Sequence, residues 1–265
     1  MKIYISADIE GVNGICSWPE TDASHPRYLE FKEQMTEEVR RACVGAKDAG
    51  ASEIFVKDAH GSAMNINVKS LPEYVMLHRG WEGSVCSMMA GLDSGFTAVV
   101  FIGYHSPSRS NGNSLSHTMN TNIHHVKING EIASEFLINS LYASYLNVPI
   151  AFLSGDLHLT EIVKKTNQNI EVVATKEGRG GAAVSRHPNL TNKEIEEKVN
   201  LSLRKDLSKN IVPLPQQFDI EIQYRKPIDA YNASFFPGCK LIGSDTISFH
   251  TNDYYQVLVM FKFNL

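Results

Sequence analysis

The stretch MKIYISADIEGVNG, residues 1–14, contains an apolar run that ends in two carboxylates and a glycine. The run predicts a buried strand over residues 2–7, and Asp8 and Glu10 follow where the backbone leaves the sheet. Two close carboxylates repel each other and resist ionisation unless a cation lies between them. The stretch therefore predicts the first half of a metal site, with a turn or cap role as the alternative for the two residues.

The segments that follow complete a strand–helix–strand unit. Apolar side chains recur every three or four positions over residues 28–49, which predicts a helix, and Gly50 ends it. Residues 53–57 (EIFVK) then form a second predicted strand, and residues 97–103 (TAVVFIG) are the most strand-like run in the chain. This order implies parallel strands with right-handed crossovers.

The same alternation continues to about residue 210, and the character of the chain changes there. We expect strands at 74–78, 125–128, 148–154 and 171–175, helical turns at 87–92, helices at 133–146, 160–166 and 192–207, and loops at 106–122 and 176–188. Beyond a proline-containing linker, we expect a strand at 218–224, short strands within 240–249 and a helix or strand at 254–263. The predicted fold class is α/β, a parallel-rich sheet flanked by helices, with residues 1–210 as the catalytic metal-binding domain and 211–265 as a smaller C-terminal α+β portion.

Composition limits the classes of function. The chain has 265 residues, 43% hydrophobic and 20% charged, with a net charge of -4. This balance is ordinary for a soluble globular protein and favours neither a nucleic-acid nor a membrane surface. Four scattered cysteines without a CxxC pair, and an N-terminus without a signal-peptide pattern, predict a cytoplasmic protein with reduced thiols.

Ligand-type residues follow three of the predicted strands. Asp8 and Glu10 follow the first, His60 the second, and His105 the run at 97–103. The carboxyl ends of strands in an open parallel sheet face one crevice, and carboxylates and neutral histidines are the ligands that zinc prefers. A single histidine of this kind is more often a loop residue bonded to backbone, but three strand ends together favour a metal centre. Two metals about 3.5–4 Å apart can activate water for amide or phosphate hydrolysis.

Four short motifs occur in a fixed order along the chain: Asp8-Ile9-Glu10-Gly11, Asp58-Ala59-His60-Gly61, Gly103-Tyr104-His105 and Ser116-His117-Thr118-Met119. In this order the sequence resembles the D-aminopeptidase family of binuclear zinc metallopeptidases. The resemblance covers most of the chain and is strongest from residue 1 to about 156.

The resemblance implies a particular set of site residues. It places two Zn²⁺ ions per chain on the metal ligands Asp8, Glu10, His60, His105 and Glu135. It makes Asp8 the bridge between the two ions and His117 the catalytic histidine. Glu135 is implied by the resemblance alone, because a carboxylate in the first turn of a helix is by default a residue that interacts with the helix dipole.

The resemblance also implies an activity and an assembly. It predicts an aminopeptidase that hydrolyses the N-terminal amide bond of short peptides, with an N-terminal D-residue, and that forms a ring-like homo-oligomer, a decamer. Two other functions remain open from the residues themselves: a metallophosphoesterase and a non-catalytic module that binds a metal or metabolite. The first lacks a clear basic clamp for phosphate, although Arg79, Arg109 and Arg179 are candidates. A dinucleotide-binding site is disfavoured because GxGxxG is absent.

Overall fold

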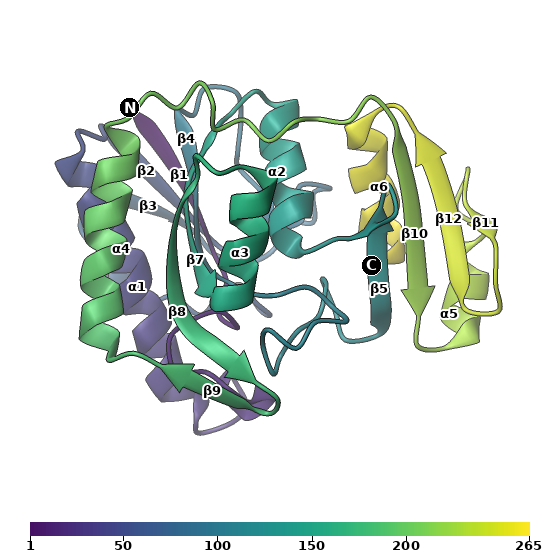
Figure 1. Ribbon diagram of the computed structural model, residues 1–265, viewed down its shortest axis with the longest axis horizontal. Coiled ribbons are helices and arrows are strands. Elements are labelled where there is room, and N and C mark those ends of the chain that lie inside the picture. Colours follow the sequence, from purple (N-terminus) through teal and green to yellow (C-terminus); the bar gives the residue numbers. More distant parts are fainter.

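The computed structural model describes residues 1–265 and contains two sheets (Figure 1). The larger sheet has seven strands in the order β3-β2-β1-β4-β7-β8-β9, and only the β8–β9 pair is antiparallel. The strands are β1 Lys2–Ala7, β2 Glu53–Asp58, β3 Val75–His78, β4 Ala98–Tyr104, β7 Ile150–Asp156, β8 Glu171–Arg179 and β9 Ala182–Ser185. From β1 the chain runs outward to β2 and β3 on one side, and then returns to β4 and β7 on the other. The order therefore reverses between β1 and β4, which is where open α/β sheets bind ligands.

Helices cover both faces of this sheet. Alternate residues of a strand point to opposite sides, so each strand buries apolar side chains under the helices of both faces. Ile3 and Ile5 of β1 share a buried cluster with residues of α1 (Tyr28–Asp48) and α4 (Pro188–Leu203). Tyr4, on the other face, belongs to the cluster that contains residues of α2 (Glu135–Tyr145) and α3 (Leu157–Thr166). Three short 3₁₀ turns complete this part: η1 Trp18–Glu20, η2 Val68–Ser70 and η3 Ser87–Met89.

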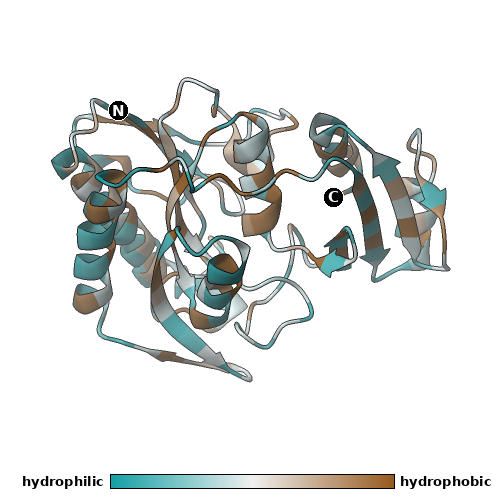
Figure 2. Cartoon of the chain, turned by 45° about the horizontal axis from the view of Figure 1, so that its top comes forward, coloured by the Kyte–Doolittle hydropathy of each residue, from teal (hydrophilic) through white to brown (hydrophobic).

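A second, antiparallel sheet has the strand order β11-β12-β10-β5-β6. Its elements are β5 Ile123–Ile128, β6 Glu131–Ile132, β10 Phe218–Tyr224, α5 Pro227–Ala233, β11 Lys240–Leu241, β12 Thr246–Thr251 and α6 Tyr254–Asn264. Hydropathy alternates along β10 and β12, as expected for strands with one buried face (Figure 2). Helix α6 lies between this sheet and α2, and the Tyr254 hydroxyl donates to the Ile138 carbonyl at 2.6 Å. The buried face of the second sheet thus belongs to the same hydrophobic core as one face of the seven-stranded sheet.

The predicted fold class is confirmed, and the local differences have physical reasons. The expected loop at 176–188 is wrong in part, because β8 continues to Arg179 and pairs with β9 as a hairpin. The expected helix at 192–207 begins earlier, at Pro188, whose missing N–H is tolerated in a first turn. The short helix α5 was not expected, and 254–263 is helical. None of the helices has the length and apolar character needed to cross a membrane.

The division of the chain at residue 210 stays a prediction. Strand β5 pairs with β10 and β6 pairs with β5, so residues 123–132 belong to the second sheet and not to the larger one. The second sheet therefore combines strands from both sides of that residue.

Candidate metal centre

The predicted ligand residues meet at the carboxyl ends of the central strands. Asp8 and Glu10 follow β1, His60 follows β2, His105 follows β4, and Glu135 opens α2. The Nδ1 atom of His60 lies 3.1 Å from Glu10 Oε2 and 3.4 Å from Asp8 Oδ1. The Nε2 atom of His105 lies 3.5 Å from both Asp8 Oδ2 and Glu135 Oε2. All five side chains are thus within reach of one small volume.

Two glycines allow the ends of β1 and β4 to approach this closely. A Cβ atom on Gly11 would lie 1.8 Å from the carbonyl oxygen of Tyr104. Gly103 has a φ of +69°, and a Cβ there would lie 2.3 Å from the Asp8 carbonyl oxygen. The Gly11 N–H instead donates to the Gly103 carbonyl at 2.8 Å. Larger residues would force apart the two strand ends that carry the ligand-type side chains.

Backbone carbonyls fix the orientation of each histidine ring. His60 directs Nε2 to the Thr21 carbonyl at 3.0 Å, and His105 directs Nδ1 to the Ser106 carbonyl at 2.9 Å. Because a carbonyl only accepts, the nitrogen facing it carries the proton. The opposite nitrogen of each ring faces the carboxylates, and it carries a free electron pair when the ring is neutral. Such an outer hydrogen bond is the usual device for orienting metal-binding histidines.

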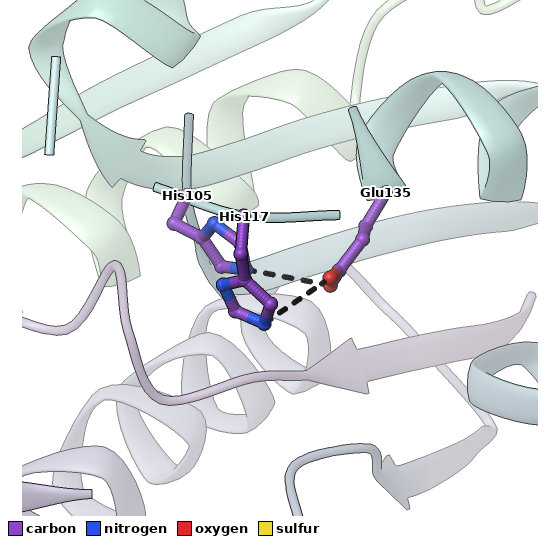
Figure 3. A group of neighbouring side chains, drawn as sticks. All are labelled: His105, His117 and Glu135. Carbon is purple, nitrogen blue, oxygen red and sulfur yellow. Dashed lines mark ion pairs between the residues drawn. The ribbon is translucent and has the colours of Figure 1, made fainter. Parts of the chain in front are cut away.

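His117 lies in the same cluster, next to His105 and Glu135 (Figure 3). Its Nδ1 atom donates to the Leu115 carbonyl at 2.9 Å, and its Nε2 atom lies 3.7 Å from Glu135 Oε1. The His105 and His117 rings stack with centroids 4.4 Å apart and an interplanar angle of 7°. The rings of Trp18 and His117 pack in a T-shaped arrangement with centroids 5.3 Å apart. The polar loop at 106–122 therefore delivers this histidine to the centre.

Three buried ligand-type atoms in this cluster have no hydrogen-bond partner: Asp8 Oδ2, Glu10 Oε2 and His105 Nε2. Buried polar atoms are nearly always paired, so three orphans facing one another fit a cation between them. Ligand atoms of Asp8, Glu10 and His105 all lie within 4.8 Å of one another, and so do those of His105, His117 and Glu135. Mixed carboxylate and imidazole ligands suit zinc and neighbouring transition metals.

The ionisation of the cluster reflects the same crowding. Burial, together with the charge of Glu10, raises the pKa of Asp8 to about 8. Burial also opposes ionisation of Glu10, but the charge of the neighbouring His60 outweighs it and lowers that pKa. For His105, burial opposes the charged form, yet Glu135 and the other carboxylates raise its pKa to about 10. A bound cation replaces these protons as the partner of the carboxylates.

Supporting residues around the centre were not predicted from the sequence. Lys176 of β8 is buried, and its Nζ atom donates to the carbonyls of Glu10 and Ile15, each at 2.5 Å. The Asn113 side chain donates to the same Glu10 carbonyl at 2.9 Å and to Asp156 Oδ2 at 3.2 Å. A lone lysine within an expected loop carries no signal of burial, so sequence patterns could not find it.

The centre opens into a cavity of about 440 Å³. The cavity is lined by two half-exposed tryptophans, Trp18 and Trp81. Apolar residues of η3, α2 and α6 also line it: Met88, Ile138, Leu258 and Phe261. Lys262 is the only lysine or arginine on the lining. The cavity thus joins a polar centre to an apolar section supplied partly by the C-terminal helix.

Comparisons with known proteins identify the family of the chain. A family model described as peptidase M55, D-aminopeptidase, matches residues 1–263. A D-aminopeptidase of Bacillus subtilis (strain 168) is 29% identical over 267 residues, covering 98% of this chain and 96% of the relative. A solved structure, described as the Zn-dependent D-aminopeptidase DppA from Bacillus subtilis, a self-compartmentalizing protease, has a TM-score of 0.91 and 28% identity, covering 100% of this chain and 98% of that one. Since the family model spans nearly the whole sequence, the chain belongs to the M55 family of D-aminopeptidases.

Proposed function

We propose that this chain is a zinc-dependent aminopeptidase that hydrolyses the N-terminal amide bond of short peptides beginning with a D-residue. The observation that carries the proposal is the set of three buried, unpaired ligand atoms where the strand order reverses. Membership of the M55 family supports the reaction, and the relative described as zinc-dependent supports the metal.

In this proposal two zinc ions would be held by Asp8, Glu10, His60, His105 and Glu135. The two oxygens of Asp8 face different histidines, Oδ1 toward His60 and Oδ2 toward His105, which suits a carboxylate shared between two ions. When bound, such a pair of ions supplies a Lewis acid for the scissile carbonyl and lowers the pKa of the attacking water toward neutrality.

His117 is the proposed proton carrier, which takes a proton from the attacking water and donates it to the leaving amine. Its Nδ1 proton is held by the Leu115 carbonyl, so Nε2 is the atom that faces the centre and exchanges a proton there. Packing against His105 and Trp18 fixes the ring, which places that nitrogen before substrate arrives. Glu135 Oε1 accepts from the Met119 N–H at 2.7 Å and ties the loop carrying His117 to α2.

Parallel assays test the activity. The zinc-loaded protein should hydrolyse D-alanine p-nitroanilide, cleave the L-isomer more slowly, and leave p-nitrophenyl phosphate intact. Phosphate hydrolysis without amide hydrolysis would instead support the metallophosphoesterase, although a cavity with one lysine and no arginine offers little to bind a phosphate dianion. Absence of both activities, with metal bound, would support the non-catalytic module.

We further propose a ring-like homo-oligomer, a decamer, located in the cytoplasm. The self-compartmentalizing description of the relative supports assembly. Large apolar side chains are also exposed around α5 and α6, including Ile228, Tyr231, Phe235 and Phe263, and such patches favour contact with another protein. All four cysteines are free, which suits a reducing compartment. Light scattering that returned a single species of 29.5 kDa would rule out the assembly.

A further inference from the structure

We propose that the apolar end of the cavity receives the side chain of the substrate's N-terminal residue, and that the enzyme prefers a branched or aromatic apolar residue there over alanine. The apolar end is the surface formed by Met88, Ile138, Leu258 and Phe261. The inference rests on the proposed aminopeptidase function and names the substrate class of that same site.

The apolar end lies next to the proposed metal centre. Ile138 is three residues after Glu135 on α2, and residues at this spacing share one face of a helix. Leu258 and Phe261 come from α6, which is fixed to α2 by the hydrogen bond from Tyr254 to the Ile138 carbonyl. The apolar end and the proposed metal centre thus line the same cavity, and α2 contributes a residue to each.

The residues of this end are nearly buried, whereas the two tryptophans on the cavity lining are half-exposed. The four residues of the apolar end are 3–6% exposed. Trp18 and Trp81 are 42% and 43% exposed. Trp81 is held in place by its Nε1–H, which donates to the Gly61 carbonyl at 2.7 Å, and by Lys57, whose Nζ atom lies 4.4 Å from the ring centroid. The apolar end thus lies on the buried side of the cavity, and Trp81 lies on the exposed side with its ring held in one orientation.

The direction of the substrate follows from the reaction class. An aminopeptidase has one residue on the amino side of the scissile bond, so that residue fits a closed end, while the leaving peptide needs the open side. Alanine offers one methyl group to the apolar end and leaves most of that apolar surface in contact with water. A larger apolar side chain displaces that water and buries apolar surface, which favours binding and turnover.

The test compares p-nitroanilides of D-alanine, D-leucine and D-phenylalanine with the zinc-loaded enzyme. We expect kcat/KM for the D-leucine substrate to exceed that for D-alanine by at least about tenfold. Leu258→Phe, which fills the apolar end, should lower the D-leucine to D-alanine ratio by about tenfold or more. Leu258→Ala should raise the ratio of D-phenylalanine to D-leucine. The matched control is Leu201→Phe on α4, where the leucine is 51% exposed and the ratios should not change.

Ratios within one variant cancel any loss of folded enzyme, and a binding measurement adds a second readout. In calorimetry the product D-leucine should bind the zinc-loaded enzyme more tightly than D-alanine, and Leu258→Phe should remove the difference. Cleavage of D-alanine at least as fast as D-leucine, with ratios unaffected at Leu258, would overturn the inference and leave the proposed function standing. If no amide substrate is cleaved, the proposed function fails and the inference fails with it.

Discussion

Replacing Lys176 by methionine tests whether this buried lysine holds the proposed metal centre from behind. Burial lowers the pKa of Lys176 to about 8, and its Nζ atom donates to the Glu10 and Ile15 carbonyls. Methionine fills similar space but donates nothing. The Glu10 carbonyl keeps a bond from Asn113, whereas that of Ile15 loses the bond from Nζ.

The expected cost follows from these bonds. Hydrogen bonds to a charged group contribute about 1.5–3 kcal/mol each, and an unpaired buried carbonyl costs about 1–3 kcal/mol. Part of this is offset because the ammonium group no longer has to be buried. We therefore expect Lys176→Met to lower the free energy of unfolding by about 2–4 kcal/mol, and zinc affinity by about 10–100-fold because the backbone of Glu10 is less firmly held.

Two assays measure these effects. Urea unfolding of chelator-treated protein, followed by tryptophan fluorescence, gives the change in stability, and competition with a chromogenic chelator gives zinc affinity. The control is Lys193→Met on α4, where the lysine side chain is 72% exposed and the change in stability should be within about 0.5 kcal/mol. If Lys176→Met behaved like this control in both assays, the supporting role of Lys176 would be refuted.

Three further predictions concern the proton donor, a buried carboxyl and the metal. His117→Ala should lower kcat by about 10²–10⁴-fold with two zinc ions retained. The control is His124→Ala, at an exposed position, which should leave kcat unchanged. Loss of one zinc ion from His117→Ala would instead show that His117 is a metal ligand. Burial raises the pKa of Glu38 from 4.5 to about 7, so the folded state binds the proton of this carboxyl group more tightly than the unfolded chain does. The free energy of unfolding should therefore fall by up to about 3 kcal/mol as the pH rises from 4.5 to 7. Urea titrations of chelator-treated protein should find that fall removed in Glu38→Gln, and an unchanged slope would contradict the assignment. Chelation should abolish amide hydrolysis and lower the melting temperature, with recovery on adding zinc; full activity after verified metal removal would exclude the proposed mechanism.

The first strand and its partners show what sequence patterns reveal well. Parallel strands must carry residues at their carboxyl ends to one edge, so the placement of Asp8, His60 and His105 together followed from strand order. Glu135 carried no such signal, because its approach depends on where α2 begins. Only the resemblance to a family pointed to it.

Features set by packing between distant segments were beyond sequence patterns. Lys176 donates to backbone more than 160 residues away, and Leu258 of α6 lines a cavity formed mainly by the first half of the chain. Strand β5 pairs with β10 across about 90 residues, which local alternation does not encode. The hairpin β8–β9 was missed because three glycines close together favour a loop. In the structure Gly178 belongs to β8, and Gly180 and Gly181 form the turn.

The zinc content of the chain and of its Asp8→Asn variant tests the central claim most directly. Protein purified without chelator and analysed by mass spectrometry for metals should contain about two zinc ions per chain. Asp8→Asn removes a charge from the carboxylate proposed to face both ions, so this variant should contain fewer than two. Wild-type protein that binds no transition metal after zinc is supplied, or an Asp8→Asn variant that retains both ions with unchanged affinity, would contradict the account.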